Sequence, residues 1–173
     1  MNGLEQIKQA VAETLCRAGV KAVTEYGQGR LGAYEEAVAV VGIKEAESRE
    51  LGFLSYLGEV YDDVRGTFVE RYAKRMEAVL SLDVYAPKTV GAPGTEAAME
   101  RAVEILTEGL PTGIKIGKAV WENVEWDELS GMYRRCGTLH SQALLIAEAD
   151  PEEDGLILDF ILKGVMKNER NFA

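Results

Sequence analysis

The residues best suited to nucleophilic chemistry are one histidine and one cysteine in the same segment. His140 is the only histidine of the chain, and Cys136 precedes it by four residues in the segment RRCGTLHSQALLI. This segment favours a strand, where a spacing of four places both side chains on one face but roughly 13 Å apart. A nucleophile and its base must share a hydrogen bond. We therefore do not expect His140 and Cys136 to act together as base and nucleophile. One histidine is also too few for a histidine-based metal site.

Two glycine-containing segments could bind phosphate. Residues 27–32 read GQGRLG and fit the G-x-G-x-x-G pattern after a short predicted strand. The dinucleotide motif also needs a helix that begins within the glycines and meets the pyrophosphate. Because the following segment is rich in Val and favours a strand, we interpret the glycines as a hairpin turn. The GAPG segment at 91–94 lacks the Lys and Ser/Thr of a P-loop. We expect no cofactor at either segment.

Acidic residues form several short groups that could do acid–base or metal chemistry. They are Glu45, Glu47 and Glu50; Asp62 and Asp63; Glu122 to Glu128; and Asp150, Glu152, Glu153 and Asp154. A catalytic pair needs a cleft and two separated pKa values, which no spacing here indicates. The last group lacks the EF-hand spacing for calcium. We interpret these groups as solvated turns, and the last one as an acidic surface or channel wall. We expect neither enzymatic activity nor a bound metal.

Composition narrows the class of protein further. The chain has 173 residues, 47% of them hydrophobic, which predicts one folded domain over 1–166 and a polar tail over 167–173. Its formal net charge of −10 repels the phosphate backbone of a nucleic acid, so no sequence-specific nucleic-acid partner is expected. No apolar run approaches the roughly 20 residues that span a bilayer, and the N-terminus lacks the apolar core of a signal peptide. We expect a protein made in the cytoplasm, with no membrane partner.

The hydrophobic pattern predicts two helices and several strands. Helices are expected at 3–18, with Leu4, Ile7, Val11 and Leu15 on one face, and at 95–108, capped by Thr95. The clearest strand lies within 67–86, where apolar residues alternate with polar ones. Other strands are expected at 20–26, 37–43, 115–122, 132–149 and 156–166. Strands that follow one another through short turns favour an α+β fold, with two helices packed on a mainly antiparallel, twisted sheet.

Residues 44–66 show no clean period and predict a loop with the exposed aromatic side chains Phe53, Tyr56 and Tyr61. Within this loop, four apolar residues are expected either to fold onto the core or to contact a partner. They are Phe53, Leu54, Tyr56 and Leu57. Aromatic side chains suit partner contacts because they bury a large area with few rotatable bonds.

Four segments resemble the tail terminator, or tail completion, proteins of long-tailed bacteriophages and prophage-derived tail-like particles. They are the opening amphipathic helix; AVAVVGIKEAESRELGFLSYLGE at 37–59; MEAVLSLDVYAP at 76–87 with the helix TEAAMERAVEIL at 95–106; and YRRCGTLHSQALLIAEA at 133–149. Together they cover most of the chain.

The resemblance implies a structural virion protein without catalytic residues. Such a protein forms a ring, usually of six copies, on the head-proximal end of the tail tube, stops tube polymerisation and joins the tail to the head. Its expected partners are further copies of itself, the tail tube protein and the head–tail connector proteins. Two alternatives remain open: another neck or tail component (tube, sheath-associated or head-completion protein), and a small α/β ligand-binding protein or enzyme.

Overall fold

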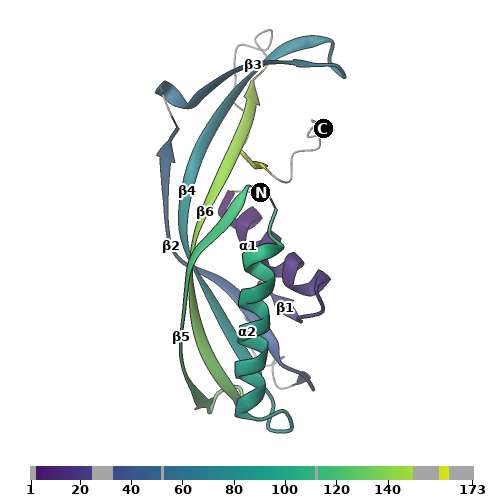
Figure 1. Ribbon diagram of the computed structural model, residues 1–173, viewed down its shortest axis with the longest axis vertical. Helices are drawn as coiled ribbons and strands as arrows, with labels where there is room; N and C mark the ends of the chain where they lie inside the picture. The colour runs from purple at the N-terminus through teal and green to yellow at the C-terminus, as the bar shows by residue number, and fades with distance from the viewer. Residues whose placement is uncertain (1–2, 25–32, 52, 112, 150–159, 164–173) are drawn as a thin grey trace.

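In the computed structural model, two helices pack on one face of an open, mostly antiparallel sheet (Figure 1). The structure describes residues 3–24, 33–51, 53–111, 113–149 and 160–163. Its helices are α1 (Gly3–Arg17), α2 (Ala92–Glu108) and the short 3-10 helix η2 (Phe53–Ser55). Its strands are β1 (Ala22–Val23), β2 (Val38–Glu50), β3 (Tyr56–Asp62), β4 (Thr67–Ala86), β5 (Ile114–Asp127), β6 (Met132–Ala149) and β7 (Ile161–Leu162). The main strand order is β1-β2-β4-β6-β5; β3 pairs with β4, and β7 pairs with β6. The α+β prediction is confirmed.

Helix α1 forms where the sequence pattern places it. Ile7, Val11 and Leu15 have no exposed surface and pack into the main core, so the predicted apolar face is confirmed. Gly19 has a φ of +85°, the left-handed conformation that ends a helix at low steric cost.

The long strands β4 and β6 form the centre of the sheet. The predicted inner face of β4 is confirmed, because Ala78, Leu80, Leu82, Val84 and Ala86 are all almost completely buried. Leu139 and Ala143 of β6 join the same core beneath the two helices. Burial of one face of each strand fixes the pairing, since a slip of one residue would turn that apolar row toward solvent.

Helix α2 begins three residues earlier than expected, and the prediction of Thr95 as its cap is wrong. Gly91 occupies the cap position, and Pro93 lies in the first turn, where its fixed φ suits a helix and its missing N–H costs nothing. Thr95 instead lies inside the helix. Its buried hydroxyl donates a hydrogen bond to the Ala92 carbonyl at 2.7 Å.

The loop predicted for residues 44–66 is also wrong. Strand β2 continues to Glu50, which pairs with Lys74 of β4, and β3 then forms a hairpin with the first part of β4. Both faces of the 44–50 segment are exposed, so it carries no apolar period that sequence inspection could detect. Gly58, with a φ of +116°, lies where the β3–β4 register shifts.

One connection differs in direction from the expectation. Strand β1 pairs with β2 in parallel, and not in the antiparallel fashion expected of consecutive strands. The Gly27–Gly32 segment, which we interpreted as a hairpin turn, most of the 156–166 strand and the polar tail lie outside the described residues. Strand β5 extends to Asp127, beyond the predicted end at 122, because it pairs with β6 as far as Met132.

Gly137 provides a test of the packing between α2 and the sheet. A Cβ atom there would lie 2.7 Å from the Leu82 carbonyl oxygen and 3.0 Å from Met99 Cε. We expect Gly137→Ala to lower the free energy of unfolding by about 1–3 kcal/mol, measured by urea denaturation. Gly117→Ala is the matched control, because its nearest neighbour, the His140 carbonyl oxygen, is 3.9 Å away. Equal stability of both variants would contradict this packing.

Candidate partner-binding surface

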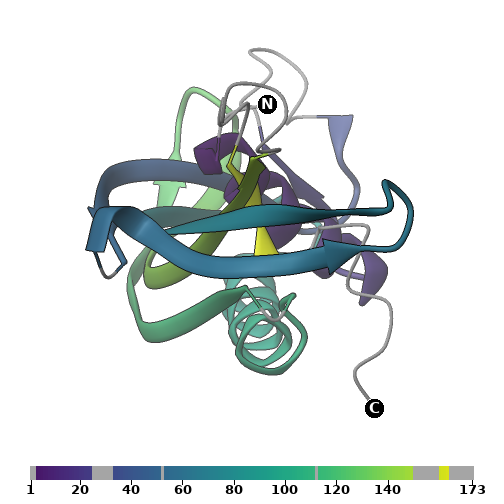
Figure 2. The ribbon, with the colours of Figure 1, turned by 90° about the horizontal axis from the view of Figure 1, so that it is seen from above.

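The β3–β4 hairpin extends beyond the region of the sheet that α1 and α2 cover (Figure 1). Figure 2 shows it from above as a two-stranded ribbon. The Asp62 carboxylate closes its turn by accepting hydrogen bonds from the backbone N–H groups of Val64, at 2.8 Å, and Arg65, at 3.2 Å. Gly66 follows with a φ of +70°. The ordered turn holds Val64, which is 87% exposed, at the tip.

Aromatic side chains gather on one face of this hairpin. Tyr56 lies opposite Tyr72, and Tyr61 lies opposite Phe68. The ring centroids of these two edge-to-face pairs are 5.6 Å and 5.2 Å apart, respectively. Tyr61 and Phe68 nevertheless remain 50% and 55% exposed. Stacked rings with half of their surface in water are suited to burial against another protein.

Two carboxylates lie between the aromatic pairs. Glu59 and Glu70 are directly opposite each other in the β3–β4 register, an arrangement in which like charges repel. The Tyr72 hydroxyl donates a 2.6 Å hydrogen bond to Glu70, and this bond raises the pKa of Tyr72. The face is therefore both aromatic and negative, which suits a Lys or Arg side chain of a partner.

The structure brings the predicted contact residues together with others that sequence inspection missed. Leu54, Tyr56 and Leu57 are exposed by 66%, 44% and 47%; the Phe53 side chain lies outside the described part of the structure. The exposure expected for Tyr61 is confirmed, and the exposed apolar residues of the hairpin that sequence inspection missed are Val60, Val64 and Phe68. The two aromatic segments around DDVRG are a hairpin signal that could have identified them.

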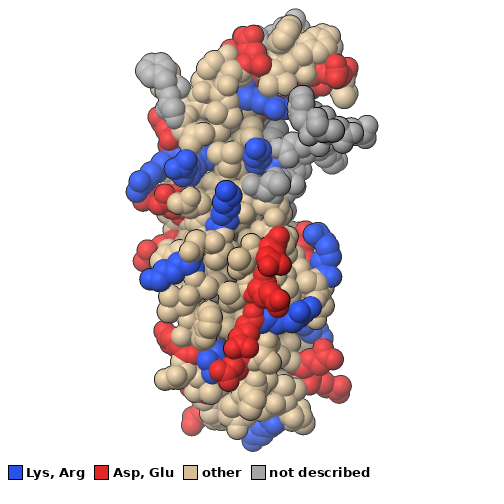
Figure 3. Space-filling model, viewed as in Figure 1, with Lys and Arg blue, Asp and Glu red and all other residues tan. Residues whose placement is uncertain are grey.

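The predicted acidic surface of Asp150, Glu152, Glu153 and Asp154 lies outside the described residues. A different acidic row is present on α2, where Glu96, Glu100 and Glu104 are exposed at intervals of four residues. Figure 3 shows this row as a continuous red strip along the helix. The i, i+4 spacing of the glutamates was the signal available in the sequence.

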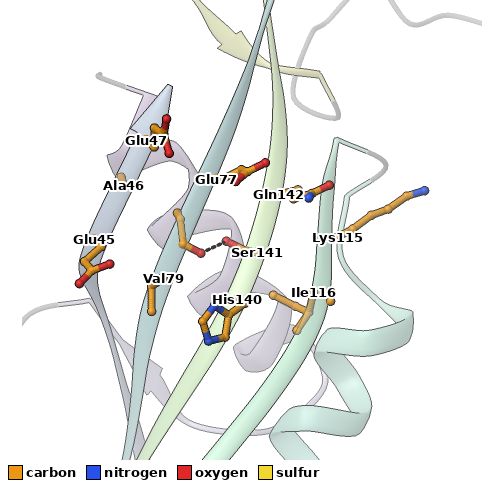
Figure 4. A pocket seen from close by; sticks show the side chains of 12 residues that line it. Glu45, Ala46, Glu47, Glu77, Val79, Lys115, Ile116, His140, Ser141 and Gln142 are labelled. Carbon is orange, nitrogen blue, oxygen red and sulfur yellow. Dashed lines mark hydrogen bonds between the residues drawn. The ribbon is translucent and has the colours of Figure 1, made fainter. Parts of the chain in front are cut away.

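A shallow groove crosses the sheet face opposite the helices (Figure 4), and the exposed His140 lies in it. Three glutamates also line the groove: Glu45, Glu47 and Glu77. Within the described residues, no three His, Cys, Asp or Glu side chains converge closely enough to hold a metal ion. Cys136 is partly buried; this burial and then the nearby Asp83 carboxylate raise the pKa of its thiol. A raised pKa leaves less of the reactive thiolate at neutral pH.

The described helices include none that is long and apolar enough to cross a membrane. Compared with models of known protein families and with curated protein sequences, the chain has no significant match to either.

The opposed carboxylates predict a hairpin that is less stable than it could be. We expect Glu59→Gln to remove the repulsion from Glu70 and to stabilise the hairpin by about 0.2–1 kcal/mol. Slower hydrogen exchange of the β3 and β4 amides would report this change. Glu35→Gln, an exposed carboxylate outside the hairpin, is the control and should leave these rates unchanged. Faster exchange in Glu59→Gln would show that the Glu59 charge stabilises the hairpin instead.

Proposed function

We propose that this chain is a non-enzymatic structural protein of a phage tail or tail-like particle, and specifically a tail terminator. In this role it forms a ring on the head-proximal end of the tail tube, stops tube polymerisation and joins the tail to the head. The observation that carries the proposal is the projecting β3–β4 hairpin with its exposed aromatic face. The resemblance of four sequence segments to tail terminators supplies the type of particle.

The hairpin is suited to hold the end of a tube. Its aromatic side chains supply large contact areas, and the ordered strands on which they lie lose little entropy when a partner binds. The repulsion between Glu59 and Glu70 is relieved when a cationic side chain approaches. Binding a partner would therefore cover the aromatic surface and reduce the carboxylate repulsion, both of which destabilise the hairpin in the isolated subunit.

The acidic row of α2 supports a role beside a DNA path. Repeated in every copy of a ring, Glu96, Glu100 and Glu104 make a negative surface that repels the phosphate backbone. DNA can pass such a surface without adhering to it.

A different neck or tail component would use the same exposed hairpin. The distinction lies in where the protein binds on the particle, because a terminator binds only one end of the tube. An enzyme or ligand-binding protein would use the groove around His140 instead.

Binding to tube ends tests the proposal. Tubes polymerised from the tail tube protein of the same phage or prophage would be mixed with this protein and imaged by negative-stain electron microscopy. We expect density at one end of each tube and arrested growth. Because Leu57→Ala with Tyr61→Ala removes two exposed hairpin anchors, it should weaken end binding by about tenfold or more.

The control is Val90→Ala with Leu129→Ala, which removes exposed apolar groups from the β4–α2 and β5–β6 connections and should bind tube ends normally. Both connections lie at the end of the molecule away from the hairpin (Figure 1). Binding along the whole tube would favour a sheath-associated role. Absence of binding to tube ends would refute the terminator function.

A further inference from the structure

The sheet is open at two edges that differ from each other. On one side, β2 pairs with β1 only at Ala39 and Val40, and no described strand pairs with its free side beyond them. On the other side, β5 pairs only with β6 among the described strands. Within the described part of the chain, both edges therefore present backbone N–H and C=O groups that pair with no strand, and such groups can accept a further strand.

At one level of the sheet, the two edges carry opposite charges: glutamates on β2 and lysines on β5. The register aligns four residues across neighbouring strands: Glu47, Glu77, Gln142 and Lys115. The adjacent row consists of Glu45, Val79, His140 and Lys118. Each row therefore begins with a glutamate on β2 and ends with a lysine on β5. Figure 4 shows Lys115 pointing away from the sheet on the free side of β5.

The lysines of β5 and the glutamates of β2 are exposed and can form ion pairs with a partner. Lys115 and Lys118 are exposed, and neither forms an ion pair with a described residue. Glu47 pairs with Arg49 at 3.0 Å, but both side chains are about 60% exposed, so this ion pair contributes little energy and can be replaced by one with a lysine of a partner. Lys44 does not oppose the acidic edge, because its Nζ donates a 2.8 Å hydrogen bond to Thr138, over the sheet.

We propose that copies of this chain associate side by side, with the β2 edge of one copy along the β5 edge of the next. Successive strands β2, β4, β6 and β5 are antiparallel, so β5 meets the β2 of an equally oriented copy in antiparallel fashion. That pairing places Glu47 opposite Lys115 and Glu45 opposite Lys118. Glu45 and Glu47 are two residues apart, whereas Lys115 and Lys118 are three apart. The register shift of β5 at Ile116/Lys118 takes up the extra residue, so that one alignment satisfies both pairs.

The two edges are different surfaces, so the contact is heterologous and generates a ring or an open filament rather than a two-fold dimer. The proposal names the subunit contact of the proposed ring and in that sense rests on the proposed function. Its evidence, however, is the register and charge of the sheet edges alone.

Charge reversal tests the contact. At the level of the contact, Glu45→Lys with Glu47→Lys makes both edges basic, and Lys115→Glu with Lys118→Glu makes both acidic. We expect each variant to self-associate about tenfold or more weakly than the unchanged protein, measured by sedimentation velocity at low salt up to the highest soluble concentration. An equimolar mixture should associate again, because the basic β2 edge of one variant then meets the acidic β5 edge of the other.

Glu13→Lys with Glu128→Lys is the control, since it changes the net charge as much as Glu45→Lys with Glu47→Lys does but lies on α1 and in the β5–β6 turn, and it should associate like the unchanged protein. Circular dichroism verifies that each variant is folded. The proposal is overturned if the mixture stays monomeric, if either reversed variant associates normally, or if the unchanged protein remains monomeric throughout. Tube-end binding is measured on the same samples: if tube ends are bound without edge pairing, only this contact fails, whereas edge pairing without tube binding refutes the terminator function.

Discussion

Strands β4 and β6 pair in one constant register from Glu70–Ala149 to Ala86–Tyr133, and this pair positions the other main elements. Its inner face supplies the apolar surface on which α1 and α2 pack. On one side of the pair, β4 forms hydrogen bonds with β2 and β3. On the other side, β6 forms hydrogen bonds with β5 and β7. Truncating a side chain such as Leu82, buried at the centre of this pair, would remove about 2–5 kcal/mol of stability.

The exposed hairpin follows from a difference in length. A strand of 20 residues such as β4 extends over roughly 65 Å, whereas a helix of 17 residues such as α2 extends over roughly 25 Å. The helices therefore cannot cover the whole face of β4. The part of β4 that pairs with β3 lies beyond them and keeps its aromatic side chains half in water. Such a surface gains free energy when another protein covers it.

Exposed apolar side chains and edge charges are concentrated in particular regions of the described structure. His140 and Cys136 lie four residues apart on one face of β6, and the groove around His140 is open. By contrast, seven exposed apolar residues gather around one hairpin, and the two sheet edges carry opposite charges in register. The proposed role uses these surfaces: the hairpin to hold another protein and the edges to hold further copies.

Elements that bury one apolar face could be predicted from the sequence. The 3.6-residue period of α1 and the alternation at Ala78–Ala86 could be recognised because a buried face imposes its period on the sequence. The structure beyond that face depends on strand pairing, which local sequence does not reveal. Strand β2 runs to Glu50 and β3 forms a hairpin because β4 is long enough to pair with both, although neither segment has a buried side that would mark it. The opposition of Glu59 to Glu70 and the alignment of Glu47 with Lys115 depend on cross-strand register, which joins residues far apart in the chain and is set by packing of the whole sheet.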